Sequence, residues 1–330
     1  MPFRDIIGHT RLTALLARAV ARESVPPTLL LAGPGGVGKW RVALAIAEAL
    51  NCQARVNGDA CGVCRSCDRI ARGVHVDVVP IVADDTGAIK IAAVRKMLED
   101  CEYRPFEGTR RVVIIRDADA AREEAQNALL KSLEEPPPGT VFVLTSAAPD
   151  ALLRTVRSRT MRLTFGRLTT SEVEHLLVRD HQREPAEARR LAGLSDGSVG
   201  TALALGSSDL TDARDAAMQL LGAAGERDLA GRLAVAKAVV GEKKDERTRQ
   251  ELTAVLQLAS SLVRDLSLLH AGSDRRLLAN GDLGERLDRL ARTLSAPAAR
   301  KAFATVDRAL SALERNAGVK LVTEWVASEI

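Results

Sequence analysis

The feature that most constrains this chain is a glycine-rich segment, G-P-G-G-V-G-K-W, lying between an apolar run and a helix-forming run. Residues 27–32 read as a short buried strand, and residues 41–50 are rich in helix formers. Strand, glycine loop and helix in this order are the context of a phosphate-binding loop, in which backbone N–H groups surround a polyphosphate. The predicted loop residues are Gly33, Pro34, Gly35, Gly36, Val37, Gly38, Lys39 and Trp40.

The last position of this loop departs from the pattern G-x-x-x-x-G-K-[ST]. The pattern ends in a hydroxyl that ligates Mg²⁺, and Trp40 takes its place. An indole N–H only donates a hydrogen bond, so Trp40 offers no oxygen to a hard cation. Because Lys39 and the glycines remain, the residues leave open whether ATP or ADP is bound, and they argue against its hydrolysis.

Four of the five cysteines cluster as C-x8-C-x2-C-x2-C. Two C-x2-C pairs suit tetrahedral Zn²⁺ better than a disulfide framework, and four protein ligands describe a closed, structural site. Reduced free thiols or a redox site are the alternative. The predicted ligands are Cys52, Cys61, Cys64 and Cys67, whereas Cys101 stands apart in an apolar helical pattern and is expected to be a buried small hydrophobe.

Length and composition place the chain among soluble globular proteins. A length of 330 residues suggests two or three domains, and the net charge of +4 permits nucleic-acid contact without requiring it. Aromatic residues make up 2% of the chain, which disfavours base-stacking platforms. No apolar run approaches the roughly 20 residues that span a bilayer, so we expect a cytoplasmic protein without a membrane partner.

Strand and helix patterns alternate along the first half of the chain. Further strands are predicted at 76–82, 111–115, 140–145 and 161–165, with helices between them. This alternation predicts a parallel, doubly wound α/β sheet. After about residue 169 the strand patterns stop, and helical patterns continue to the end of the chain.

Three further motifs carry a resemblance to one family. They are Y-R-P-F-E-G at 103–108, N-A-L-L-K-S-L-E-E-P-P at 127–137, and Ser158-Arg159. Together with the loop and the cysteines, they resemble bacterial sliding-clamp loader subunits of the AAA+ class, from the DNA polymerase III holoenzyme. The resemblance implies an AAA+ nucleotide-binding-like domain at 1–166 with a zinc module at 51–68. A small helical lid at 167–206 and an all-α oligomerisation (collar) domain at 207–330 would follow.

Two kinds of subunit share these motifs: the ATP-hydrolysing tau/gamma motor and the delta-prime subunit, which is usually a poor ATPase. In a motor, Asp-Glu would stand where this chain has Arg116-Asp117, and an arginine would stand at Gly200. With Trp40, these departures favour delta-prime, a component of the polymerase holoenzyme without intrinsic ATPase activity. The alternatives are a divergent tau/gamma motor or another autonomous AAA+ ATPase, and, more remotely, a small-molecule P-loop kinase.

One functional position of the family is retained. Ser158-Arg159-Thr160 matches the family motif Ser-Arg-Cys, which implies that Arg159 is an arginine finger acting in trans on the ATP of a neighbouring motor subunit. The alternative is a general basic surface around Arg159. Thr145 occupies the place of the family's first sensor residue, and we expect it to be structural here.

The resemblance also implies partners. These are the tau/gamma motor subunits and the delta subunit, and through them the sliding clamp. Backbone contacts to primer-template DNA are a further hypothesis, because Thr86-Gly87-Ala88 precedes a helix that carries Lys90 and Arg95. A solvated helix face is the alternative, and it is the more common explanation of such residues.

Overall fold

The computed structural model describes residues 1–84, 86–207, 210–223, 234, 246–314 and 317–330. The chain divides into two compact units, Met1–Leu168 and Thr169–Ile330. Parts of the predicted collar, at 208–209, 224–233, 235–245 and 315–316, lie outside the described residues. The division of the second unit at 206/207 into lid and collar stays a prediction.

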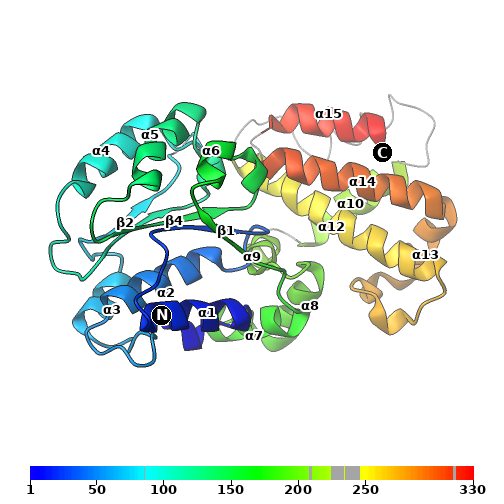
Figure 1. The fold of residues 1–330 in the computed structure, drawn as a ribbon. Helices are drawn as coiled ribbons and strands as arrows, with labels where there is room; N and C mark the ends of the chain where they lie inside the picture. The colour runs from blue at the N-terminus through cyan, green and yellow to red at the C-terminus, as the bar shows by residue number, and fades with distance from the viewer. Residues whose placement is uncertain (85, 208–209, 224–233, 235–245, 315–316) are drawn as a thin grey trace. The chain divides into compact units, whose positions relative to one another are not determined.

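The first unit is built on a five-stranded parallel sheet with the strand order β2-β3-β4-β1-β5 (Figure 1). The three central strands are fully buried, which explains why their middle residues are consecutively apolar rather than alternating with polar ones. The strands are β1 (Thr28–Ala32), β2 (Val78–Ile81), β3 (Arg111–Ile115), β4 (Thr140–Ser146) and β5 (Met161–Thr164).

Helices cover both faces of this sheet. Alternate residues of one strand point to opposite faces, so Leu29 and Leu31 join one core cluster while Leu30 joins the other. The first cluster includes residues of α1 and α2, and the second includes residues of α4 and α5. The helices and turns of this unit are η1 (Phe3–Asp5), α1 (Thr10–Ala21), α2 (Lys39–Asn51), α3 (Arg65–Ala71), α4 (Ile91–Cys101), η2 (Ala118–Ala120), α5 (Glu123–Glu134), η3 (Pro149–Ala151) and α6 (Arg154–Arg157).

The parallel sheet brings the candidate site residues together at the carboxyl ends of its strands. The glycine loop follows β1, Arg116 follows β3, and Thr145 lies near the end of β4. Because these strands are parallel neighbours, the three segments meet at the carboxyl ends of the strands, where ligands bind in open α/β sheets.

The second unit contains only helices among its described residues. α7, α8 and α9 pack against one another, and α12 packs against α10, α13, α14 and α15. The helices and turns are α7 (Thr170–His181), α8 (Pro185–Leu194), α9 (Val199–Ser207), α10 (Leu210–Ala223), α12 (Glu246–His270), η4 (Arg275–Leu277), η5 (Gly281–Leu283), α13 (Gly284–Thr293), α14 (Ala296–Glu314) and α15 (Val319–Glu329). The predicted fold class, an α/β domain followed by helices, is confirmed.

One described helix, α12 over Glu251–His270, is long and apolar enough to cross a membrane by length and composition alone. Core helices pass the same test, and the inward residues Leu256, Leu262 and Leu266 are completely buried. Its apolar character is therefore explained by packing within the unit.

Candidate functional site

The glycine loop lies between β1 and α2, as the sequence predicts. Gly33 N–H donates to Ser146 O at 3.1 Å, which ties the start of the loop to β4. A Cβ at Gly33 would lie 2.4 Å from the carbonyl oxygen of Phe165, so only glycine fits there. Gly38, with a φ of 101°, forms the N-cap of α2, and a Cβ on it would meet nothing within 4 Å. The loop therefore leaves open space at the helix N-terminus, which suits an anionic group.

Lys39 is turned onto its own loop. Its Nζ donates to Gly33 O at 2.7 Å and to Pro34 O at 2.6 Å, and the side chain is buried. In the phosphate-binding motif, the ammonium group of this lysine instead contacts the β- and γ-phosphates. For Lys39 to bind a phosphate, it must exchange these carbonyl oxygens for phosphate oxygens.

Trp40 and Arg116, which stand where the resemblance to motor subunits implies magnesium ligands, contact each other. The Arg116 guanidinium lies 5.5 Å from the centroid of the Trp40 ring, in a cation–π arrangement. Its Nε is also 3.5 Å from Oδ2 of Asp117. The Arg116 guanidinium thus pairs with the neighbouring Asp117 carboxylate. The donor set around the loop does not fit Mg²⁺, which takes oxygen ligands.

Thr145 is used within the fold. Its hydroxyl accepts a hydrogen bond of 2.9 Å from the Asp117 N–H, and its side chain is buried. Asp117 has a φ of 49°, in the left-handed region, so this bond supports a turn that costs free energy for a non-glycine residue. The structural role expected for Thr145 stays a prediction.

Arg159 follows α6 in the chain, and its guanidinium is bound by groups of the same chain. Its Nε and Nη2 both lie 3.0 Å from Oε2 of Glu134, and its Nη1 donates to Thr155 O at 3.1 Å. Sequence reasoning did not single out Glu134 as a partner of Arg159. The E-E-P-P ending of the 127–137 motif was the available signal.

The four cysteines of the predicted zinc module come together. Their sulfur atoms all lie within 4.8 Å of one another, and none of them is in a disulfide. Sulfur atoms about 3.8 Å apart are expected around a tetrahedral Zn²⁺ with 2.3 Å bonds. Cys52 follows α2, Cys61 lies in the intervening turn, Cys64 forms the N-cap of α3, and Cys67 lies within α3. The cluster could therefore hold a tetrahedral metal ion.

The thiols of the cluster have divergent acidities. Burial raises the pKa of Cys64, but backbone N–H groups of Cys67 and Gln53 and the neighbouring thiols outweigh it and lower the pKa to about 6. Burial raises the pKa of Cys67 far above its usual range, and the Cys64 and Cys52 sulfurs raise it further. The Cys64 thiolate therefore forms more readily than that of a free cysteine, whereas Cys67 favours its protonated form, and a bound metal ion would deprotonate both.

A buried carboxylate that sequence analysis did not identify fixes the 103–108 loop. The oxygens of Asp77 accept hydrogen bonds of 2.7–2.8 Å from the backbone N–H groups of Phe106, Glu107 and Gly108. Arg111 adds an ion pair at 3.4 Å and also donates to backbone carbonyls of this loop. Burial raises the pKa of Asp77, but these donors outweigh it and hold the pKa below its ordinary value. In the sequence, the only indication of this role was the position of Asp77 directly before an apolar strand.

Lys90, one of the proposed DNA-contacting residues, is paired within the chain. Its Nζ is 2.6 Å from Oδ2 of Asp84, and this contact holds the pKa of that carboxyl well below its usual range. Asp84 also accepts from the Thr86 N–H. A carboxylate therefore stands among the residues that would meet a phosphate backbone.

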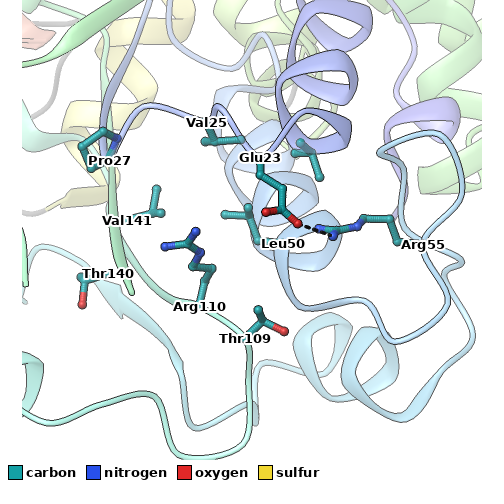
Figure 2. Close-up of a pocket in the computed structure, with 10 residues that line it drawn as sticks. Glu23, Val25, Pro27, Leu50, Arg55, Thr109, Arg110, Thr140 and Val141 are labelled. Atoms are coloured by element: carbon teal, nitrogen blue, oxygen red, sulfur yellow. Dashed lines mark ion pairs between the residues drawn. The ribbon is translucent and has the colours of Figure 1, made fainter. Parts of the chain in front are cut away.

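A cavity of about 140 Å³ lies at the opposite, amino-terminal edge of the sheet (Figure 2). The Arg110 side chain lines it, and Glu23 and Arg55 form a 3.9 Å ion pair at the same cavity. Arg110 and Arg116 flank β3 at its two ends, so this cavity is separate from the glycine loop.

The chain is similar to subunits of bacterial DNA polymerase III. A family profile described as DNA polymerase III, delta subunit, matches residues 8–169. DNA polymerase III subunit tau of Salmonella typhimurium is 30% identical over 281 residues, covering 81% of this chain and 43% of that protein. The tau subunit of Escherichia coli is 32% identical over 208 residues, covering 62% of this chain and 32% of that protein. The chain belongs to the DNA polymerase III clamp-loader family.

The match to these relatives is partial, since the chain spans less than half the length of either tau subunit. Among solved structures, a gamma subunit-related protein from Thermotoga maritima covers 95% of this chain and 96% of its own, at 19% identity and a TM-score of 0.42. The RuvB Holliday junction branch migration motor of Thermotoga maritima covers 85% of each chain, at 17% identity and a TM-score of 0.40. The AAA+ fold of the first unit rests on its strand order and on the family match.

Proposed function

We propose that this chain is the delta-prime subunit, a stator, of a DNA polymerase III clamp loader. The observation that carries the proposal is the contact between Arg116 and Trp40 at the positions where a motor subunit would hold magnesium. A metal-dependent ATPase needs oxygen ligands there, and this pair supplies a cation and an indole. Gly200, exposed on α9, likewise provides no group for a γ-phosphate.

The proposal assigns the catalytic contribution to Arg159, acting on the ATP of a neighbouring motor subunit. An arginine supplied in trans stabilises charge on the transferring phosphoryl group. Glu134 would hold the guanidinium in position until it meets the phosphate, because it anchors Nε and Nη2 on the surface of the first unit. The partners are then the tau/gamma motors and the delta subunit, with the clamp, primer-template DNA and a cytoplasmic location following from that assembly.

Two bound groups belong to this proposal. The cysteine cluster would hold a structural Zn²⁺, since its four sulfurs provide a closed ligand set. The glycine loop would hold ATP or ADP without hydrolysing it, since the open space at Gly38 and the adjacent Lys39 remain suited to phosphate.

The competing function is an ATP-hydrolysing motor of the tau/gamma kind, which the tau relatives favour. Turnover by the isolated protein separates the two. We expect no ATP hydrolysis above background from the chain alone. A rate of about 1 s⁻¹ or more, in the usual enzyme range, that disappears in Lys39→Ala would establish the motor instead.

The arginine finger is tested in the assembled complex. Arg159→Ala should leave assembly intact and lower the stimulated ATP hydrolysis in part, because it affects one of several sites. In GTPases a comparable arginine contributes about 10³–10⁵ in rate. Arg159→Lys should rescue poorly, since an ammonium lacks the planar two-point contact with phosphate oxygens.

The matched control is Arg157→Ala, which removes a nearby arginine that pairs with Asp150. It should leave ATP hydrolysis unchanged. Equal losses from Arg157→Ala and Arg159→Ala would instead indicate a general basic surface, and the finger assignment would be wrong.

A further inference from the structure

The contact between Trp40 and Arg116 joins two segments that are far apart in the sequence. Trp40 begins α2 after the glycine loop, and Arg116 follows β3. We propose that this pair takes the place of the divalent cation, so that the loop binds a nucleoside triphosphate as the magnesium-free polyphosphate. The inference rests on the proposed nucleotide binding and goes beyond it, because it states which form of the nucleotide is bound.

The charges around the loop favour a bare polyphosphate over its magnesium complex. Lys39 and Arg116 bring two positive charges to the carboxyl edge of the sheet. A metal ion placed there would be repelled by the guanidinium. A polyphosphate without its metal carries more negative charge and pairs better with two cations.

The carboxylates that could counter this repulsion already have partners. Asp117 lies 3.5 Å from Arg116, and Oδ1 of Asp119 accepts from the Ala147 N–H at 3.2 Å. Trp40 adds no oxygen ligand. The described residues around the loop therefore fit the phosphates but not the metal.

The Arg116 side chain is exposed enough to reorient toward a bound phosphate. Its side chain is 54% exposed, and its contacts are the face of Trp40 and a long ion pair to Asp117. When the guanidinium turns toward a phosphate, it leaves the indole. The emission of Trp40 should then change on binding, which gives a readout independent of catalysis.

The test uses the full chain with Trp325→Phe, so that Trp40 is the only tryptophan. ATP is titrated in EDTA and again in excess Mg²⁺, with binding followed by Trp40 emission and by calorimetry. We expect binding in EDTA to be at least as tight as in Mg²⁺. Arg116→Ala should weaken binding in EDTA on the order of tenfold, the effect of losing one charge-assisted hydrogen bond.

The matched control is Arg110→Ala. It removes the same charge from the other end of β3, where the side chain lines the separate cavity of Figure 2. Its affinity for ATP should equal that of the parent protein. Trp40→Thr combined with Arg116→Asp should reverse the preference, because it restores a hydroxyl and a carboxylate to the metal position, and ATP should then bind more tightly in Mg²⁺.

Three results would overturn the inference: ATP binding by the parent protein only with Mg²⁺, no binding in either condition, or equal losses in Arg116→Ala and Arg110→Ala. Any of them leaves the stator proposal standing, since that proposal is judged by Arg159→Ala in the assembled complex. Conversely, if Arg159→Ala has no effect on ATP hydrolysis by the complex, the stator proposal fails, but the ATP titrations still test this inference.

Discussion

At the scale of single residues, Asp77 holds the 103–108 loop through several hydrogen bonds. It is fully buried and accepts from three successive backbone N–H groups and from Arg111. These bonds fix the loop that carries Tyr103 and Phe106, whose side chains are 74% and 83% exposed. A rigid backbone beneath two exposed aromatic residues is typical of a contact surface, because little conformational freedom is lost on binding.

Asp77→Asn should lower the free energy of unfolding by about 3 kcal/mol, since it removes the charge from a buried, hydrogen-bonded ion pair. The pKa of Asp77 is lowered in the folded state, so the unfolded chain binds the proton more readily. The stabilisation is therefore complete above the unfolded pKa of about 4 and is lost as the pH falls through the folded pKa. Urea unfolding at several pH values checks this, and the variant should lose less stability on acidification than the parent.

Asp68→Asn is the control, because Asp68 is an exposed carboxylate paired with Arg72 on the surface of α3. Its effect should stay below about 1 kcal/mol. Similar losses in the two variants would show that the hydrogen bonds of Asp77 contribute no more than a surface pair.

At the scale of elements, the cysteine cluster joins the end of α2 to the start of α3. The segment between the two helices forms only a short bridge between Val56 and Asp59. Asp59 also accepts from the backbone N–H groups of Phe3 and Arg4. A metal ion would therefore order a segment that has little regular structure of its own.

Cys67→Ser should abolish the binding of one Zn²⁺ per chain and lower the melting temperature, because ligand binding to the folded state contributes to stability. Elemental analysis and a thermal melt of freshly purified, unchelated protein measure both effects. Cys101→Ala, which removes a buried thiol outside the cluster, should keep the metal. Parent protein without stoichiometric zinc would refute the assignment.

At the scale of the whole molecule, the chain divides into two compact units after Leu168. Helices α8 and α9 pack against α12, and Gln257 of α12 donates to the Thr201 hydroxyl at 3.2 Å. A cut at residue 206 would remove these partners from α8 and α9. The second unit should therefore be deleted as one piece.

A fragment of residues 1–168 should keep its sheet and its metal site but fail to join a complex with motor subunits. Its core clusters on both faces of the sheet lie within this range, whereas the helices proposed to mediate assembly do not. Circular dichroism and co-purification measure the two properties. Recovery of the fragment with motor subunits at the yield of the full chain would contradict a role of 169–330 in assembly.

Local patterns in the sequence were sufficient to predict most of the architecture. The apolar runs at 28–32, 111–115 and 140–145 became the three buried central strands, and the cysteine spacing predicted the cluster. Both are short-range signals: a strand buried on both faces is mostly apolar, apart from polar residues near its ends such as Arg111 and Thr140, and C-x2-C places two sulfurs close together.

The tertiary structure decided which side chains meet. That Arg116 lies on Trp40, that Glu134 holds Arg159 and that Asp77 fixes the 103–108 loop all depend on the order of strands in the sheet and on the closing of loops. A pattern read along the chain carries no information on such pairs, because each joins residues that only the parallel sheet and its helices bring within contact distance. Local patterns thus predict strands, helices and the kinds of group near the glycine loop, whereas the pairing of those groups follows from strand order and loop closure.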